Sequence, residues 1–81
     1  MSSNRAKIEQ SWFDMLKMEA LKRYDSRLTY QQMADILKCS KMKVSSAYSH
    51  SKFLDIPDSF RKEHQAVAEQ EIKKLMGVVC V

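Results

Sequence analysis

Four lysines lie in a stretch of the chain that contains no acidic residue. Between positions 36 and 54 the sequence has Lys38, Lys41, Lys43 and Lys52 and neither Asp nor Glu. The whole chain has 14 basic and 10 acidic residues, for a net charge of +4, so the excess of positive charge falls in this one stretch. Concentrated positive charge on one surface favours a polyanionic partner such as nucleic acid.

Residues for other kinds of chemistry are few and widely spaced. The chain has two cysteines, Cys39 and Cys80, and two histidines, His50 and His64, with no pair at the close spacing of a metal site. It also has no Gly-rich phosphate loop and no nucleophile and base at a useful spacing. We therefore expect no enzymatic activity, no metal and no cofactor.

Composition predicts a small helical protein. The 81 residues include one Gly and one Pro, and 44% of them are hydrophobic. This favours an all-α fold of about four helices around one core, with short connections, in a single domain spanning 1–81. No apolar run approaches the roughly 18 residues of a membrane span, and the N-terminus lacks the apolar core of a signal peptide. We expect a cytoplasmic protein that does not contact membranes.

Helix-start signals divide the chain into three parts: a helix at about 4–24, a helical pair at about 29–51 and a helix at about 57–76. Thr29, with Gln32 three residues later, matches a capping box and predicts the start of the second helix. Ser40 is the expected cap of the third helix.

The last helix is bounded by Pro57, in its first turn, and by Gly77, a plausible stop. Lys73 and Lys74 suit the dipole of its last turn. Its expected apolar stripe is Phe60, Val67, Ala68, Ile72 and Leu75. The chain ends in the short apolar tail "VVCV".

The first helix is apolar around more of its circumference than a small core requires. Its expected core stripe is Ile8, Trp12, Met15, Leu16 and Ala20. Three further apolar residues fall outside this stripe: Phe13, Met18 and Leu21. They are buried either from a second side within the domain or by a partner subunit, and we favour the partner subunit. The candidate dimer interface is Phe13, Met18, Leu21, Ile72, Met76, Val79 and Val81.

The stretch "ADILKCSKMKVSSAY" (34–48) has small and apolar residues at the positions where two helices pack across a short turn. The matching positions are Met33, Ala34, Leu37, Cys39, Val44 and Ala47. In this pattern residues 29–50 resemble the helix-turn-helix of small bacterial and phage regulators, and the similar unit of sigma-factor DNA-binding regions. The resemblance implies that the second helix of the pair lies in the major groove of DNA.

The outward residues of that helix are small, polar or basic. Five serines lie in or next to this helix: Ser40, Ser45, Ser46, Ser49 and Ser51. Because serine is a poor helix former, their presence indicates selection for something other than helix stability. The expected base contacts are Ser40, Lys41, Met42, Ser45, Ser46 and Ser49, with Lys41 facing guanine and Met42 a thymine methyl. The expected phosphate contacts are Thr29, Tyr30, Gln31, Lys38, Lys43 and Lys52.

The turn of this pattern usually carries Gly, which takes a left-handed conformation cheaply, and this chain has Lys38 there. We therefore expect Lys38 to take that conformation at a cost of about 1 kcal/mol.

The leading hypothesis is a sequence-specific regulator of transcription that binds double-stranded DNA. Because one helix reads only a few base pairs, we expect a homodimer on a palindromic operator, repressor-like and of a phage or mobile-element type. The alternative is a small inhibitor or adaptor that uses the same scaffold to bind a protein partner, through the first helix and the tail.

Overall fold

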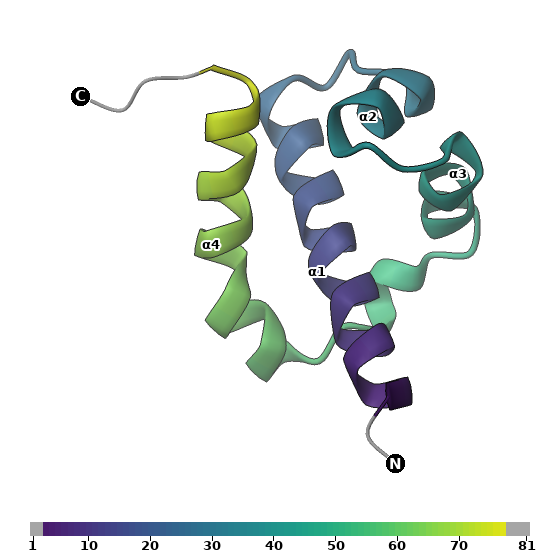
Figure 1. Cartoon of the computed structure of the whole chain (residues 1–81), viewed down its shortest axis with the longest axis vertical. Coiled ribbons are helices and arrows are strands. Elements are labelled where there is room, and N and C mark those ends of the chain that lie inside the picture. The colour runs from purple at the N-terminus through teal and green to yellow at the C-terminus, as the bar shows by residue number, and fades with distance from the viewer. Residues whose placement is uncertain (1–2, 78–81) are drawn as a thin grey trace.

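The computed structural model describes residues 3–77, with side chains from Ala6 onward. This range contains four α-helices, one 3-10 helix and no β-strand (Figure 1). The elements are α1 (Ser3–Tyr24), α2 (Tyr30–Leu37), α3 (Lys41–Ser49), η1 (Lys52–Asp55) and α4 (Asp58–Leu75). The expected all-α class with four helices around one core is confirmed.

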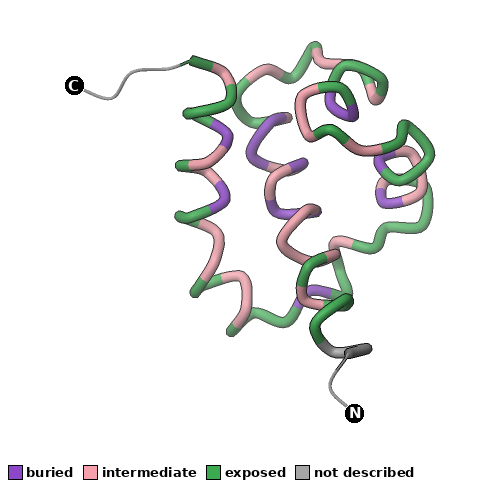
Figure 2. The backbone as a smooth tube through the Cα atoms, in the orientation of Figure 1, coloured by how far each residue is buried: buried purple, intermediate pink, exposed green. Residues whose placement is uncertain are grey.

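Helix α1 lies in the middle of the molecule, with α4 along one side and the α2–α3 pair on the other (Figure 1). Buried residues recur along the second half of α1, where α4 and the α2–α3 pair enclose it (Figure 2). Leu16, Met18 and Leu21 have no exposed surface at all. The core is completed by Met33 and Ala34 of α2, Val44 and Ala47 of α3, Ile56, and Ala68 and Ile72 of α4.

This central position corrects the predicted dimer interface. Met18, Leu21 and Ile72 lie in the chain's own core, so the prediction that they meet a second subunit is wrong. The extra apolar face of α1 is covered from two sides within the domain. Phe13 and Met76 are half-buried against the same core, and Val79 and Val81 lie outside the described residues.

Three residues predicted for core stripes are about half exposed: Ile8, Val67 and Leu75. Ile8 lies about two turns before Met15, the first buried residue of α1 among the described side chains. On α4 the buried contact face is narrow, with Ala68 and Ile72 at its centre, so Val67 and Leu75 fall at its edges.

The helix caps agree with the sequence. The Thr29 hydroxyl accepts the Gln32 N–H at 3.2 Å, and the Gln32 side chain accepts the Thr29 N–H at 2.9 Å. The Ser40 hydroxyl accepts the Lys43 N–H at 3.2 Å. Pro57 immediately precedes α4, and Gly77, with φ +73°, donates its N–H to the Lys74 carbonyl after the helix end. These local hydrogen bonds fix where α2, α3 and α4 begin or end.

Candidate nucleic-acid interface

The turn between α2 and α3 is three residues long, from Lys38 to Ser40. Lys38 has φ 58° and ψ 45°, so the predicted left-handed residue at this position is confirmed. The following Cys39 N–H donates to the Ala34 carbonyl at 3.0 Å and closes the end of α2. A tight turn of this kind places α3 directly against α2, with Ala34, fully buried, allowing a close approach.

Helix α3 is anchored through one side and open on the other. Val44 and Ala47 are buried, while Lys41, Met42 and Ser49 are exposed. The remaining predicted base contacts are Ser40, which is exposed, and Ser45 and Ser46, which are half-buried. The predicted outward face therefore exists, and its most accessible side chains come from both ends of the helix.

Aromatic packing fixes the orientation of α3. The rings of Tyr30 and Tyr48 stack with centroids 5.3 Å apart and planes 13° apart, and Tyr48 also packs on Phe53 at 4.7 Å. The Tyr48 hydroxyl donates to the Met18 carbonyl at 3.4 Å. Burial, with smaller contributions from Glu19 and Tyr30, raises the pKa of Tyr48 to about 12. Tyr30, predicted as a phosphate contact, thus has its ring committed to holding α3 in place.

The start of α2 is exposed at Thr29 and Gln31, two other predicted phosphate contacts. The Thr29 hydroxyl is already the cap acceptor, and the Gln31 amide donates to Asp35 at 3.0 Å. Both side chains are therefore held in fixed positions at a helix N-terminus, where backbone N–H groups favour an anion.

All four clustered lysines are exposed, and they differ in whether an acidic side chain of the described residues pairs with them. Among the described residues, no carboxylate lies within 4.0 Å of the amino group of Lys38, Lys41 or Lys52. Lys43 differs, because its Nζ lies 2.7 Å from Oδ2 of Asp14 on α1. The other oxygen of Asp14 accepts the Gln10 amide at 3.1 Å.

Asp14 is a residue that the sequence reasoning missed. It precedes Lys43 by 29 positions, so a count of charges along the lysine-rich stretch has no way to include it.

The nearby Cys39 thiol is half-buried. Burial raises the pKa of Cys39 more than Lys43 lowers it, which keeps the thiol neutral at the turn.

No three His, Cys, Asp or Glu residues within 3–77 lie close enough together to hold a metal ion. In the same range, no helix combines the length and the apolar character needed to cross a bilayer. No protein-family model matches the chain, and no similar chain is found among characterised proteins or solved structures.

Proposed function

We propose that this chain is a repressor-like regulator that binds double-stranded DNA through α2, its turn and α3, with α3 in the major groove. The observation that carries the proposal is the exposed face of α3, which presents Lys41, Met42 and Ser49 and no carboxylate. The major groove, about 12 Å wide, admits a helix whose outward side chains are not bulky. The opposite face, with Val44 and Ala47, holds α3 rigidly on the core.

The side chains divide into two proposed roles. Lys41 suits the guanine acceptors, and Met42, 79% exposed, suits a thymine methyl group. Lys38, at the turn, and Lys52, just after α3, flank the helix and suit the phosphates on either side of the groove.

We retain the homodimer as part of this proposal, because a single nine-residue helix reads too few base pairs for specificity. The surface joining two copies is not the central face of α1, which is buried. Analytical ultracentrifugation at micromolar concentration, with and without a palindromic duplex, measures the assembly.

The adaptor hypothesis has one observation in its favour. Met42 and Leu54 are 79% and 86% exposed, and a protein partner covering them would bury apolar surface. The apolar face of α1 no longer supports the adaptor hypothesis, since Met18 and Leu21 lie in the chain's own core.

A salt series with matched variants tests DNA binding. We would measure the fluorescence anisotropy of a labelled random-sequence duplex for the wild type, for Lys41→Gln/Lys52→Gln, and for Lys62→Gln/Lys73→Gln on α4. Both variants lose two exposed positive charges, but α4 lies across α1 from α3 (Figure 1).

The wild type should bind non-specifically at about 1–100 μM, and affinity should fall steeply with salt. In the Lys41/Lys52 variant, the slope of log K against log salt concentration should become shallower by about 0.9, the value for the one phosphate contact of Lys52, while the α4 variant keeps the slope nearly unchanged. Absence of wild-type binding at low salt, or an equal loss in both variants, would overturn the proposal.

A further inference from the structure

A groove separates the exposed edge of α3 from the middle of α1. Its volume is about 280 Å³, and its lining residues are Ser11, Met15, Met18, Met42, Lys43, Ser46, Ala47 and Lys52. Methionine side chains line it together with two amino groups and two hydroxyls. Such a surface suits a phosphodiester strand, because the sugar contacts apolar atoms while the phosphate oxygens accept hydrogen bonds.

An anion from the protein itself already occupies one position beside this groove. Asp14 is three residues beyond Ser11 on α1 and holds the Lys43 amino group at 2.7 Å. Its second oxygen is fixed by Gln10. The Asp14 and Lys43 side chains are 21% and 43% exposed, so an anion from solvent can reach the pair.

We propose that a DNA phosphate takes the place of the Asp14 carboxylate at Lys43, so that Asp14 sets the strength of DNA binding by competing for this lysine. The inference rests on the proposed function and names a residue outside the α2–α3 pair that controls it. A carboxylate and a phosphate are alternative partners for the same ammonium group. Asp14 therefore weakens binding twice, by retaining Lys43 and by remaining as a negative charge near the DNA.

The test is a double-mutant cycle on duplex binding: wild type, Asp14→Asn, Lys43→Gln and the double variant. Asparagine keeps the oxygen that accepts from Gln10 and removes the charge. Exposed ion pairs are weak, so we expect Asp14→Asn to raise non-specific affinity about 1.5- to 5-fold. The salt slope should steepen by up to about 0.9, because the cation that Lys43 displaces from the DNA is then no longer offset by a cation taken up at the freed carboxylate.

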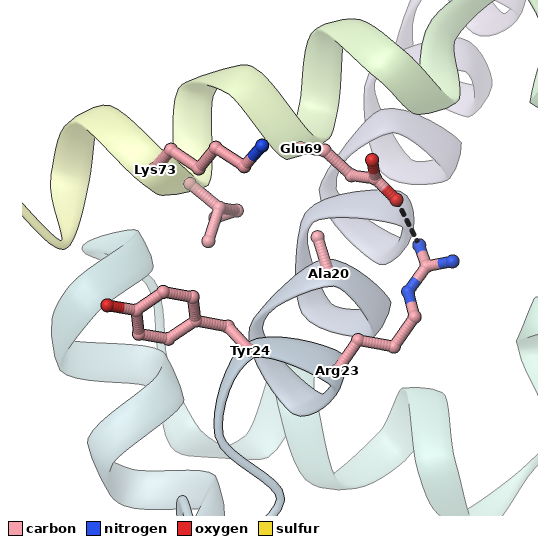
Figure 3. Close-up of a pocket in the computed structure, with 6 residues that line it drawn as sticks. Ala20, Arg23, Tyr24, Glu69 and Lys73 are labelled. Carbon is pink, nitrogen blue, oxygen red and sulfur yellow. Dashed lines mark ion pairs between the residues drawn. The ribbon is translucent and has the colours of Figure 1, made fainter. Parts of the chain in front are cut away.

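Glu69→Gln is the matched control. Glu69 of α4 pairs with Arg23, one residue before the end of α1, at 3.1 Å (Figure 3). Like Asp14→Asn, it breaks an ion pair between two helices and raises the net charge by one. It should leave the salt slope unchanged and alter affinity much less. Circular dichroism melting checks that each variant is folded, and Asp14→Ala replaces Asp14→Asn if that variant unfolds.

The possible outcomes separate this inference from the proposed function. If the wild type binds DNA and Asp14→Asn has the same effect as Glu69→Gln, only net charge matters and the inference is wrong. A loss of affinity in Asp14→Asn would mean that Asp14 positions Lys43 for DNA instead of competing for it, which also overturns the inference. If Asp14→Asn still raises DNA affinity in the Lys43→Gln background, the gain does not act through Lys43, and the inference is wrong. If no variant binds DNA, the proposed function itself fails.

Discussion

Replacing Lys38 with glycine should stabilise the protein, even though the lysine is exposed. Lys38 lies in the left-handed region, with φ 58° and ψ 45°, where a residue with a Cβ atom is strained by about 1–2 kcal/mol. Glycine removes this strain but gains freedom in the unfolded chain, which costs about 0.4–1 kcal/mol. The net expectation is an increase of about 0.8 kcal/mol in the free energy of unfolding, in a range of about 0–1.6 kcal/mol, which corresponds to about 3–6 °C in melting temperature for a domain of this size.

Urea denaturation followed by circular dichroism measures this change, with two control variants. Ser51→Gly should also stabilise, because Ser51 has φ 49°. Ser26→Gly should not, because Ser26 lies in a turn without a positive φ. If Lys38→Gly lowers stability as Ser26→Gly does, then residue 38 is not left-handed in solution and the geometry of the α2–α3 turn is wrong. Because it removes a proposed phosphate contact, Lys38→Gly should also bind DNA more weakly while being more stable.

Three further changes test the packing, the cap and the titration behaviour of the fold. Ile72→Ala should lower the free energy of unfolding by about 2–5 kcal/mol, since Ile72 is 1% exposed between α4 and α1; a loss below 1 kcal/mol in urea would contradict its core position. Thr29→Ala should cost about 0.5–2 kcal/mol by removing the cap of α2, whereas Thr29→Ser, which keeps the hydroxyl, should cost less. Because the pKa of Tyr48 is raised from 10.0 to about 12 in the folded protein, the unfolded chain loses this proton first, and stability should fall as pH rises from 10 to 12. Tyr48→Phe should have a shallower decline over that range in thermal melts, and an identical decline would show that Tyr48 is not the group responsible.

Local signals explain why much of the α2–α3 pair could be predicted from sequence. The Thr29 cap depends on Gln32, only three residues away, and the Ser40 cap depends on Lys43 in the same way. The left-handed conformation of Lys38 was implied by the resemblance to the helix-turn-helix pattern, whose turn usually carries Gly at this position. Interactions of this range are encoded by neighbouring residue types, so a pattern is enough to predict them.

Tertiary contacts explain what the sequence did not predict. Whether Met18 and Leu21 face a partner or the core depends on α4 and the α2–α3 pair enclosing α1 from two sides, which helical periodicity alone does not show. Likewise, η1 has only four residues and is held from outside, by the tilted packing of the Phe53 ring on Tyr48 and by Arg61, which donates to the Phe53 carbonyl at 3.1 Å. The Asp14–Lys43 pair is also a tertiary contact, since it joins residues 29 positions apart in the sequence.

The central claim is that α3 and the start of α2 form the surface that meets DNA. The most direct measurement is the change in backbone amide chemical shifts when a short random-sequence duplex is added to ¹⁵N-labelled protein at low salt. The largest changes should fall in residues 29–31 and 38–52, and they should disappear at high salt. Changes centred on α4, or no changes at all, would contradict it.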